Sequence, residues 1–189
     1  MHKFNPGHLE RLMSEERHSE LSPEKLLREA GLKQGQVFAD IGSGPGFFTI
    51  PAARIIGPMG LAFAVDTQEE MLLDLRDKRN PPDNVILMKS EEYEIPIADY
   101  EADFTLLAFV LHETPDKGRL LQEIKRVMKP GATLLLLDWA KKAEEKGPPL
   151  EERISDKEAR SFVEDAGFDV VQLSPLSQSH YRIIARRPA

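Results

Sequence analysis

The stretch that decides the fold is Ala39-Asp40-Ile41-Gly42-Ser43-Gly44-Pro45-Gly46-Phe47, in which three glycines stand at alternate positions. It follows a short apolar run at 37–41 and precedes a helical pattern at 47–56, so it predicts the turn between a strand and a helix. Glycines in such a turn adopt positive φ angles and let the backbone approach a ligand closely. An acidic residue, Asp40, precedes the first glycine by two positions.

Outward from this turn, apolar strands and amphipathic helices alternate along the chain. The pattern predicts strands at 37–41, 61–65, 85–88, 103–109, 133–137, 168–173 and 180–185, and helices at 47–56, 68–78, 117–128 and 155–166. Such alternation is typical of a parallel sheet covered on both faces. The connection at 174–179 is too short for a helical crossover, so the last two strands should pair antiparallel. The predicted fold is α/β: a doubly wound, mostly parallel seven-stranded sheet that ends in an antiparallel hairpin.

Ahead of the first strand lies a polar segment with helical periodicity. A short amphipathic helix is expected from His8 to about Glu20, and a second helix from Ser22-Pro23 to Gly31. We therefore divide the chain into an N-terminal helical lid at 1–25 and one domain at 26–189. If the lid closes over a ligand, Arg11 and Arg17 would be placed to contact an anionic acceptor.

Composition limits the class of protein. Of the 189 residues, 41% are hydrophobic and 30% charged, as in ordinary globular proteins. No apolar run approaches the ~20 residues that span a bilayer, and the polar N-terminus does not resemble a signal peptide, so a cytoplasmic location is expected. The chain has no cysteine, which excludes disulfides and thiolate chemistry, and no spacing of its histidines resembles a metal site. A net charge of −7 disfavours nucleic acid as a partner.

The glycine spacing favours a cationic nucleoside over a dinucleotide. A dinucleotide turn has the pattern G-x-G-x-x-G, whereas Gly42, Gly44 and Gly46 leave the turn one residue shorter. The carboxylate of Asp40 would repel a pyrophosphate but suits a ligand that carries an ammonium group. Asp66, at the end of the second predicted strand, is placed to accept both hydroxyls of a ribose. Alternatively, Asp66 caps the helix that follows it.

The chain resembles class I S-adenosylmethionine-dependent methyltransferases in three features. They are the turn from Asp40 to Gly46, Asp66 at the end of the second predicted strand, and Lys129-Pro130-Gly131 between the third helix and the fifth strand. The segments 102–113 and 120–131 are similar to the ubiquinone/menaquinone-biosynthesis type of that family. The resemblance extends over about 26–187. It implies a Rossmann-like methyltransferase fold, with S-adenosylmethionine as cofactor and S-adenosylhomocysteine as product.

The resemblance also implies which residues hold the cofactor. The family often has an aspartate after the third strand that meets the adenine amino group, and here Ser90, followed by Glu91, takes its place. A hydroxyl can accept the same hydrogen bond without charge. The implied cofactor contacts are the turn residues Gly42, Ser43, Gly44 and Gly46, Asp40 at the amino-acid end, Asp66 on the ribose, Thr67, Met71, Ser90 and Glu91 around the adenine, and Leu107 and Ala108 at the methionine end.

Methyl transfer from a sulfonium leaves few catalytic residues to find, because the cofactor carries the reactive carbon. A base is needed only where the acceptor must lose a proton. His112, just after the fourth strand at the ligand-binding edge, is the candidate base, and the alternative is that it caps a helix or bonds a neighbouring loop. Trp139 is placed either to wall the acceptor pocket or to pack against Pro148-Pro149.

The predicted function is transfer of a methyl group to a small-molecule acceptor, with a quinone-like or other small aromatic or lipid-like compound as the type that the resemblance implies. Two alternatives stay open: a nicotinamide-dependent oxidoreductase, and a protein that binds S-adenosylmethionine without catalysis. The sequence leaves open the identity of the acceptor, the atom methylated, the use of a base, and whether the chain is a monomer or a homodimer.

Overall fold

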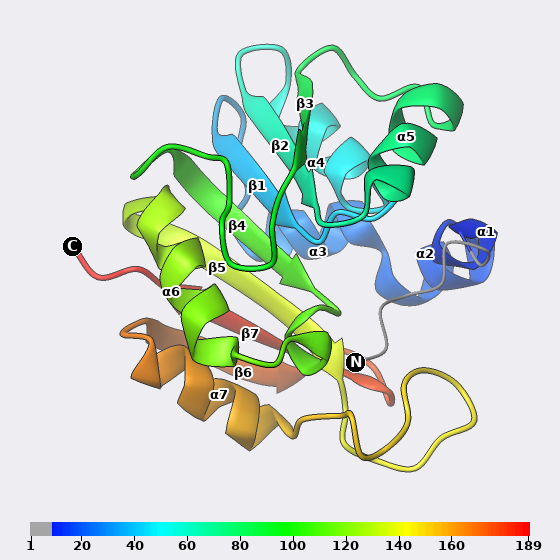
Figure 1. Cartoon of the computed structure of the whole chain (residues 1–189), viewed down its shortest axis with the longest axis vertical. Helices are drawn as coiled ribbons and strands as arrows, with labels where there is room; N and C mark the ends of the chain where they lie inside the picture. Colours follow the sequence, from blue (N-terminus) through cyan, green and yellow to red (C-terminus); the bar gives the residue numbers. More distant parts are fainter. Residues whose placement is uncertain (1–8) are drawn as a thin grey trace.

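The computed structural model describes residues 9–189 and contains a seven-stranded sheet with the order β3-β2-β1-β4-β5-β7-β6 (Figure 1). The strands β1 to β5 run parallel, and β7 lies antiparallel between β5 and β6. This confirms the predicted sheet and its terminal hairpin. The strands are β1 (Val37–Ile41), β2 (Leu61–Asp66), β3 (Val85–Lys89), β4 (Ala102–Ala108), β5 (Met128–Trp139), β6 (Asp169–Pro175) and β7 (His180–Arg186).

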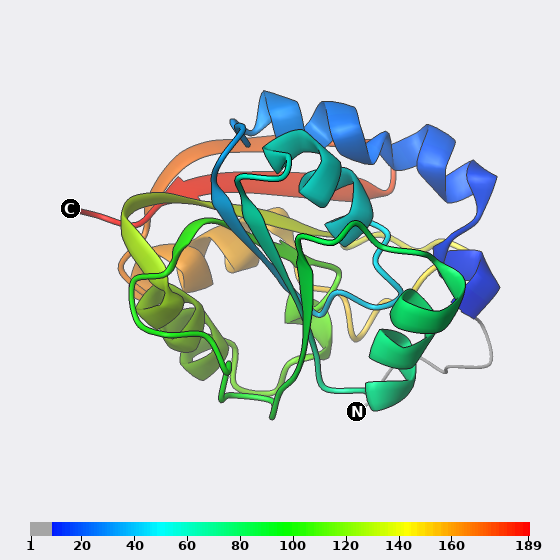
Figure 2. The same cartoon turned by 90° about the horizontal axis from the view of Figure 1, so that it is seen from above.

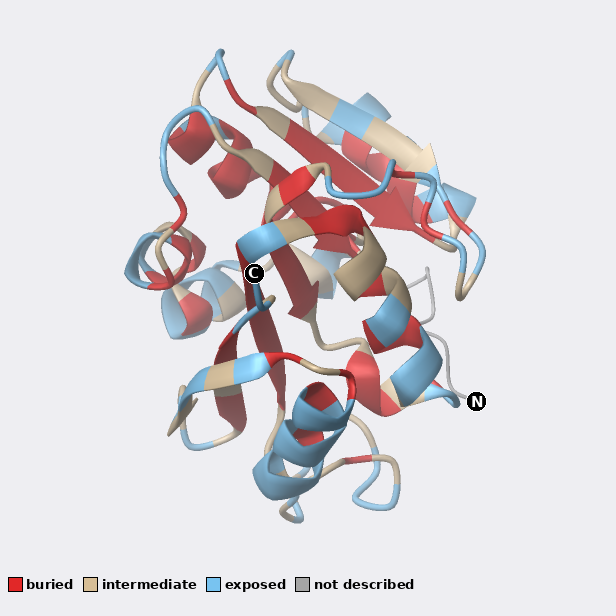
Figure 3. Cartoon of the chain, turned by 90° about the vertical axis from the view of Figure 1, so that its left-hand side faces the viewer, coloured by how far each residue is buried: buried red, intermediate tan, exposed pale blue. Residues whose placement is uncertain are grey.

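Helices cover both faces of the sheet (Figure 2). One face packs against α3 (Pro23–Glu29), α4 (Thr49–Ile56) and α5 (Glu69–Lys78), and the other against α6 (Lys117–Val127) and α7 (Asp156–Asp165). The alternation of side chains along β1 shows why: Phe38 enters the core under α3 and α4, and its neighbour Ala39 enters the opposite core. The inner strands are accordingly buried along most of their length (Figure 3).

The order of the strands reverses beside β1, which pairs with β2 on one side and with β4 on the other. Ile41, the last residue of β1, is in register with Leu107 near the end of β4. The glycine turn and the segment after β4 therefore leave the same edge of the sheet side by side. In doubly wound sheets, ligands bind at such a reversal, outside the carboxyl ends of the strands.

The N-terminal segment differs from the prediction of one helix. Two short helices are present, α1 (Leu9–Leu12) and α2 (Glu15–Leu21), because the Ser14 side chain accepts a hydrogen bond from the backbone of Arg17 and starts a new helix. His8, which we expected at the start of the helix, and His2 lie outside the described residues. The predicted second helix is present as α3, which has Pro23 at its start.

The third predicted helix ends just before Lys129-Pro130-Gly131, as expected, but the fifth strand begins earlier than predicted. Helix α6 ends at Val127, and β5 begins at Met128 and includes these three residues. Met128 pairs with Ala102, and the next paired residue of β5 is Thr133, opposite Phe104, so the residues between them form a bulge. A proline is tolerated there because a bulge does not need its missing N–H.

Candidate active site

A cavity of about 1140 Å³ lies at the carboxyl edge of the sheet, above the reversal of strand order. Its walls come from the glycine turn, from the segments that follow β2, β3, β4 and β5, and from α1 and α2, which cover one side. Ligand pockets usually have volumes of about 300–1000 Å³. This cavity is therefore large enough for a nucleoside cofactor and a second small molecule.

Most of the residues predicted to hold the cofactor line this cavity. They are Asp40, Gly42, Ser43, Gly44, Asp66, Thr67, Met71, Ser90, Glu91 and Ala108, and the candidate base His112 joins them. Two predicted residues do not line it. Gly46 packs against Leu75, whose Cδ1 atom would lie 2.4 Å from a Cβ at that position, and the Leu107 side chain is fully buried in the core.

The glycine turn is held closed by backbone and carboxylate contacts. Gly42 has a φ of +74°, and a Cβ there would come within 2.3 Å of Val110 Cγ2, so no larger residue fits. The Asp66 carboxylate accepts hydrogen bonds from the backbone N–H groups of Gly44 and Gln68, both at 2.8 Å. Asp66 thus organises the start of α5, as the capping interpretation predicts, and it also lines the cavity, where binding of a ribose stays a prediction.

Asp40 is a buried acid next to the glycine turn. Its side chain is 1% exposed and accepts a hydrogen bond of 2.6 Å from the Thr49 hydroxyl at the start of α4. Burial raises the pKa of Asp40 to about 7, although the Thr49 hydrogen bond and the charge of Arg17 lower it. A carboxyl group buried in this way favours a cationic ligand beside it.

Replacing Asp40 with Asn is expected to stabilise the ligand-free protein increasingly as the pH rises. An unfolded Asp titrates near pH ~3.9, whereas the folded-state pKa of Asp40 is about 7. The folded protein therefore loses stability between these values, and the Asn variant does not. The gain in unfolding free energy should grow by about 2–3 kcal/mol between about pH 5 and about pH 8. Urea unfolding at both pH values measures it, and a gain that does not depend on pH would contradict this account.

Arg17 of α2 reaches into the site from above. Its guanidinium lies 4.5 Å from the ring centroid of Phe47 and 5.3 Å from that of Phe109. Burial lowers the pKa of Arg17 to about 10, and the charges of Asp40 and Glu20 act in the opposite direction. An arginine stays charged at that pKa, so the site holds a fixed cation beside the buried acid.

His112 stands in a 3₁₀ turn, Leu111–Glu113, directly after β4, and Asp138 at the end of β5 orients it. The His112 Nδ1 lies 2.6 Å from the Asp138 Oδ1, and the backbone N–H of His112 donates to the Asp138 Oδ2 at 3.1 Å. Asp138 is fully buried. Burial acts to lower the pKa of His112, but the hydrogen bond and charge of Asp138 outweigh it, and the pKa is raised.

The second nitrogen of His112 has an acidic neighbour. The Nε2 atom lies 3.7 Å from the Glu113 Oε1, and both residues line the cavity. Burial raises the pKa of Glu113 to about 7, partly offset by His112. An imidazole that is fixed at one nitrogen by a buried carboxylate, in a residue that lines a cavity, is an arrangement found in general bases. Asp138 has no distinctive motif in the sequence and becomes recognisable only beside His112.

The described residues also limit other kinds of site. Between residues 9 and 189, no helix is long and apolar enough to cross a membrane. In the same range, no group of His, Asp and Glu side chains is arranged to hold a metal ion.

The fold and the site define a nucleoside-binding α/β enzyme, and comparison with known proteins specifies the family. A family model described as "Methyltransferase domain" matches residues 39–136, more than half of the chain. The chain belongs to this family. It is an S-adenosylmethionine-dependent methyltransferase, which excludes the nicotinamide-dependent oxidoreductase left open by the sequence.

Individual relatives agree with this assignment. A SAM-dependent methyltransferase from Aquifex aeolicus is 37% identical, with a TM-score of 0.93 over 98% of this chain and 100% of that one. A demethylmenaquinone methyltransferase from Staphylococcus aureus is 29% identical over 69% of this chain, and the match spans 54% of that protein. A phosphoethanolamine N-methyltransferase from Haemonchus contortus in complex with S-adenosyl-L-methionine shares the fold at 15% identity, with a TM-score of 0.74 over 89% of this chain and 52% of that one.

The residues present fit this cofactor. S-adenosylmethionine carries a sulfonium cation, an ammonium, a carboxylate and a ribose diol. The buried carboxyl of Asp40, the guanidinium of Arg17 and the carboxylate of Asp66 offer opposite charge or hydrogen-bond acceptors for these groups, and all three line the cavity.

Proposed function

We propose that this enzyme methylates a small, uncharged aromatic acceptor, such as a hydroquinone, that gives up a proton to His112. The observation that carries the proposal is the contact of 2.6 Å between His112 and the buried carboxylate of Asp138, placed at the wall of the cavity. Acceptors that need no deprotonation would have no use for an oriented base.

The cofactor would occupy the half of the cavity above the glycine turn. Arg17 and Asp40 would bind the carboxylate and the ammonium of its amino-acid part, because they form the oppositely charged neighbours there. Asp66 would accept from the ribose, and Ser90, Glu91, Thr67 and Met71 would surround the adenine. The described part of the proposed lid at 1–25, helices α1 and α2, would exclude water, since it lines the cavity.

The charge of the cavity favours an uncharged acceptor. Among the described lining residues, eight carry carboxyl groups and three carry permanent cations. They are Glu16, Glu20, Asp40, Asp66, Glu91, Glu92, Glu113 and Glu152, against Arg11, Arg17 and Lys146. An anionic acceptor would meet net repulsion here, whichever way Arg11 and Arg17 point. The sulfonium of the cofactor, by contrast, is attracted.

The acceptor half of the cavity is aromatic. The ring centroids of Trp139 and His180 lie 4.3 Å apart, and those of Phe109 and His180 lie 5.1 Å apart, and all three side chains line the cavity. A flat ring can pack against such a cluster by offset or edge-to-face contacts. Similarity to a demethylmenaquinone methyltransferase over part of its length supports the same class of acceptor.

When bound, S-adenosylmethionine supplies an electrophilic methyl group. His112 would accept the acceptor's proton at Nε2, while Asp138 holds Nδ1 protonated and stabilises the imidazolium that forms. Glu113, ionised above a pKa of about 7, would add to that stabilisation from 3.7 Å. The proton would then pass to solvent.

The rate with 1,4-naphthohydroquinone is expected to rise with pH through neutrality. The base must be unprotonated, and its pKa is raised, so the active form accumulates only above that value. The measurement is formation of S-adenosylhomocysteine from about pH 5.5 to about pH 9 under anaerobic conditions. 1,4-Dihydroxy-2-naphthoate, which has the same rings and an added carboxylate, is the matched control and should react at least about tenfold more slowly. Faster turnover of the anion, or a rate that falls across this range, would refute the proposal.

A further inference from the structure

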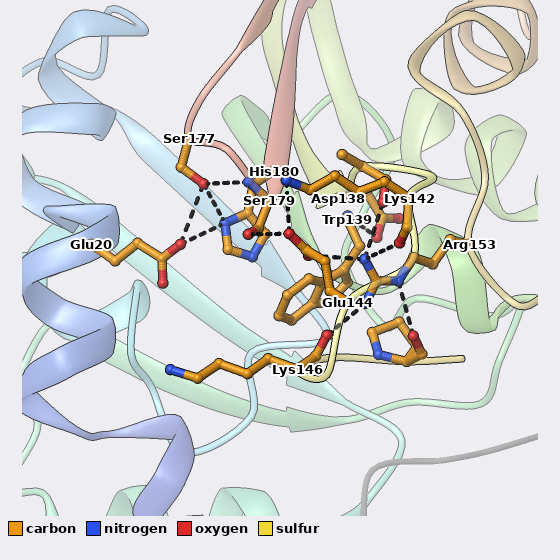
Figure 4. A network of polar contacts seen from close by, with 12 residues as sticks. Glu20, Asp138, Trp139, Lys142, Glu144, Lys146, Arg153, Ser177, Ser179 and His180 are labelled. Carbon is orange, nitrogen blue, oxygen red and sulfur yellow. Dashed lines mark hydrogen bonds and ion pairs between the residues drawn. The ribbon is translucent and has the colours of Figure 1, made fainter. Parts of the chain in front are cut away.

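The loop between β5 and α7 is built around one buried arginine. Arg153 is 1% exposed, and its guanidinium donates hydrogen bonds to the backbone carbonyls of Ala140, Lys142, Lys146 and Pro148 (Figure 4). A fifth contact, of 3.1 Å, joins it to the Glu144 carboxylate. Together these contacts use all the donor nitrogens of the side chain.

This loop has no helix or strand between Trp139 and Asp156. A segment of this length without secondary structure is usually functional or disordered, because it lacks backbone hydrogen bonds of its own. Here the guanidinium donates to four carbonyls of the loop, at residues 140, 142, 146 and 148, and so holds together parts of the loop that no helix or strand connects. The Arg153 side chain therefore supplies hydrogen bonds that hold this loop in one conformation.

The ordered loop forms one wall of the cavity. Lys146, Gly147, Pro148 and Pro149 line it. Gly147 has a φ of +88°, and a Cβ there would lie 2.8 Å from the Trp139 ring and 3.0 Å from the Arg153 Nη2. The wall thus lies in direct contact with both Trp139 and the arginine behind it.

Further contacts join the loop to Trp139, to the turn before β7 and to α2. The Arg153 guanidinium carbon lies over the Trp139 ring, 5.2 Å from the ring centroid. Glu144 accepts a hydrogen bond of 2.9 Å from the Ser179 hydroxyl in the turn before β7, and Lys146 pairs with Glu16 of α2 (Figure 4 shows the first of these). None of these contacts involves the glycine turn or Asp66.

We propose that Arg153 is a positioning residue that sets the shape of the acceptor wall, and so decides which acceptors fit, without contacting the acceptor itself. The inference rests on the proposed function only in placing the acceptor on the side of Trp139. Substitution of Arg153 should therefore change acceptor binding and the surroundings of Trp139. It should leave the cofactor half of the cavity unaltered.

The test compares Arg153→Met and Arg153→Lys with Arg160→Met, which removes an exposed arginine from α7. Lysine keeps the charge but cannot supply the planar set of donors. Trp139 is the only tryptophan of the chain, so its emission reports on the loop without any acceptor. For both Arg153 variants we expect acrylamide quenching of Trp139 to rise about threefold, KM for 1,4-naphthohydroquinone to rise about tenfold with a smaller change in kcat, and calorimetric affinity for S-adenosylhomocysteine to stay within about twofold.

The control Arg160→Met should match the wild type in all three measurements. Unchanged quenching in the Arg153 variants, or equal losses of acceptor and S-adenosylhomocysteine binding, would overturn the proposal. If naphthohydroquinone is no substrate of the wild type, the proposed acceptor class fails, while quenching and S-adenosylhomocysteine affinity still decide the role of Arg153. Should the Arg153 variants not fold, Glu144→Gln removes one partner of the guanidinium and is expected to shift quenching in the same direction.

Discussion

Replacing Asp138 with Asn is expected to lower kcat for methyl transfer about 100- to 1000-fold, because an oriented general base contributes a factor of this order. The Asn side chain keeps the shape of Asp138 but can present its amide nitrogen to His112 Nδ1, which favours the wrong tautomer and removes the charge that stabilises the imidazolium. The measurement is single-turnover formation of S-adenosylhomocysteine with saturating naphthohydroquinone.

The matched variant His112→Gln tests whether the two residues act as one unit. If they do, the double variant should lose little more activity than either single variant. The affinity for S-adenosylmethionine should remain close to that of the wild type in all three proteins, because neither residue lies on the glycine turn. Additive losses, or an Asp138→Asn variant with normal kcat, would contradict a dyad and leave His112 with a structural role.

Replacing Arg17 with Met is expected to weaken binding of S-adenosylmethionine about 30- to 100-fold, since hydrogen bonds to charged groups contribute about 2–3 kcal/mol. Met fills the space between Phe47 and Phe109 but offers no partner to a carboxylate. The loss should be similar for S-adenosylhomocysteine, which has the same amino-acid part.

Arg11→Met provides the control for Arg17→Met. Arg11 also lines the cavity, but its side chain is exposed, so its removal should change the affinity by less than about threefold. Equal effects of the two variants would indicate that general charge, rather than a specific contact of Arg17, attracts the ligand.

Most of the fold could be predicted because its signals are local. The glycine turn, the alternation of short apolar strands with helices, and the short connection before β7 each depend on neighbouring residues, and the sheet agrees with all of them. One difference is itself local, since the cap by Ser14 divides the predicted N-terminal helix in two. The other depends on a distant contact. The residues Lys129-Pro130-Gly131 follow the end of α6, but pairing of Met128 with Ala102 also makes them part of β5, as a bulge.

Local signals and distant contacts also explain which site residues could be predicted from the sequence. Asp40 and Asp66 could be proposed from the glycine turn and from the end of the second predicted strand, and His112 from its place after the fourth predicted strand. Asp138 lies 26 residues from His112, and Arg17 meets Phe109 only because α2 folds back over the sheet. Arg153 has no sequence signal, since four of its hydrogen bonds go to backbone carbonyls, which every sequence possesses.

Calorimetric titration of the wild type and of Asp66→Ala with S-adenosylmethionine, S-adenosylhomocysteine and NAD tests whether the cavity above the glycine turn binds S-adenosylmethionine. We predict micromolar binding of both sulfur nucleosides to the wild type, clear weakening of both in Asp66→Ala, and no binding of NAD. Tighter binding of NAD, or the same affinity for the sulfur nucleosides with and without the Asp66 carboxylate, would contradict the account.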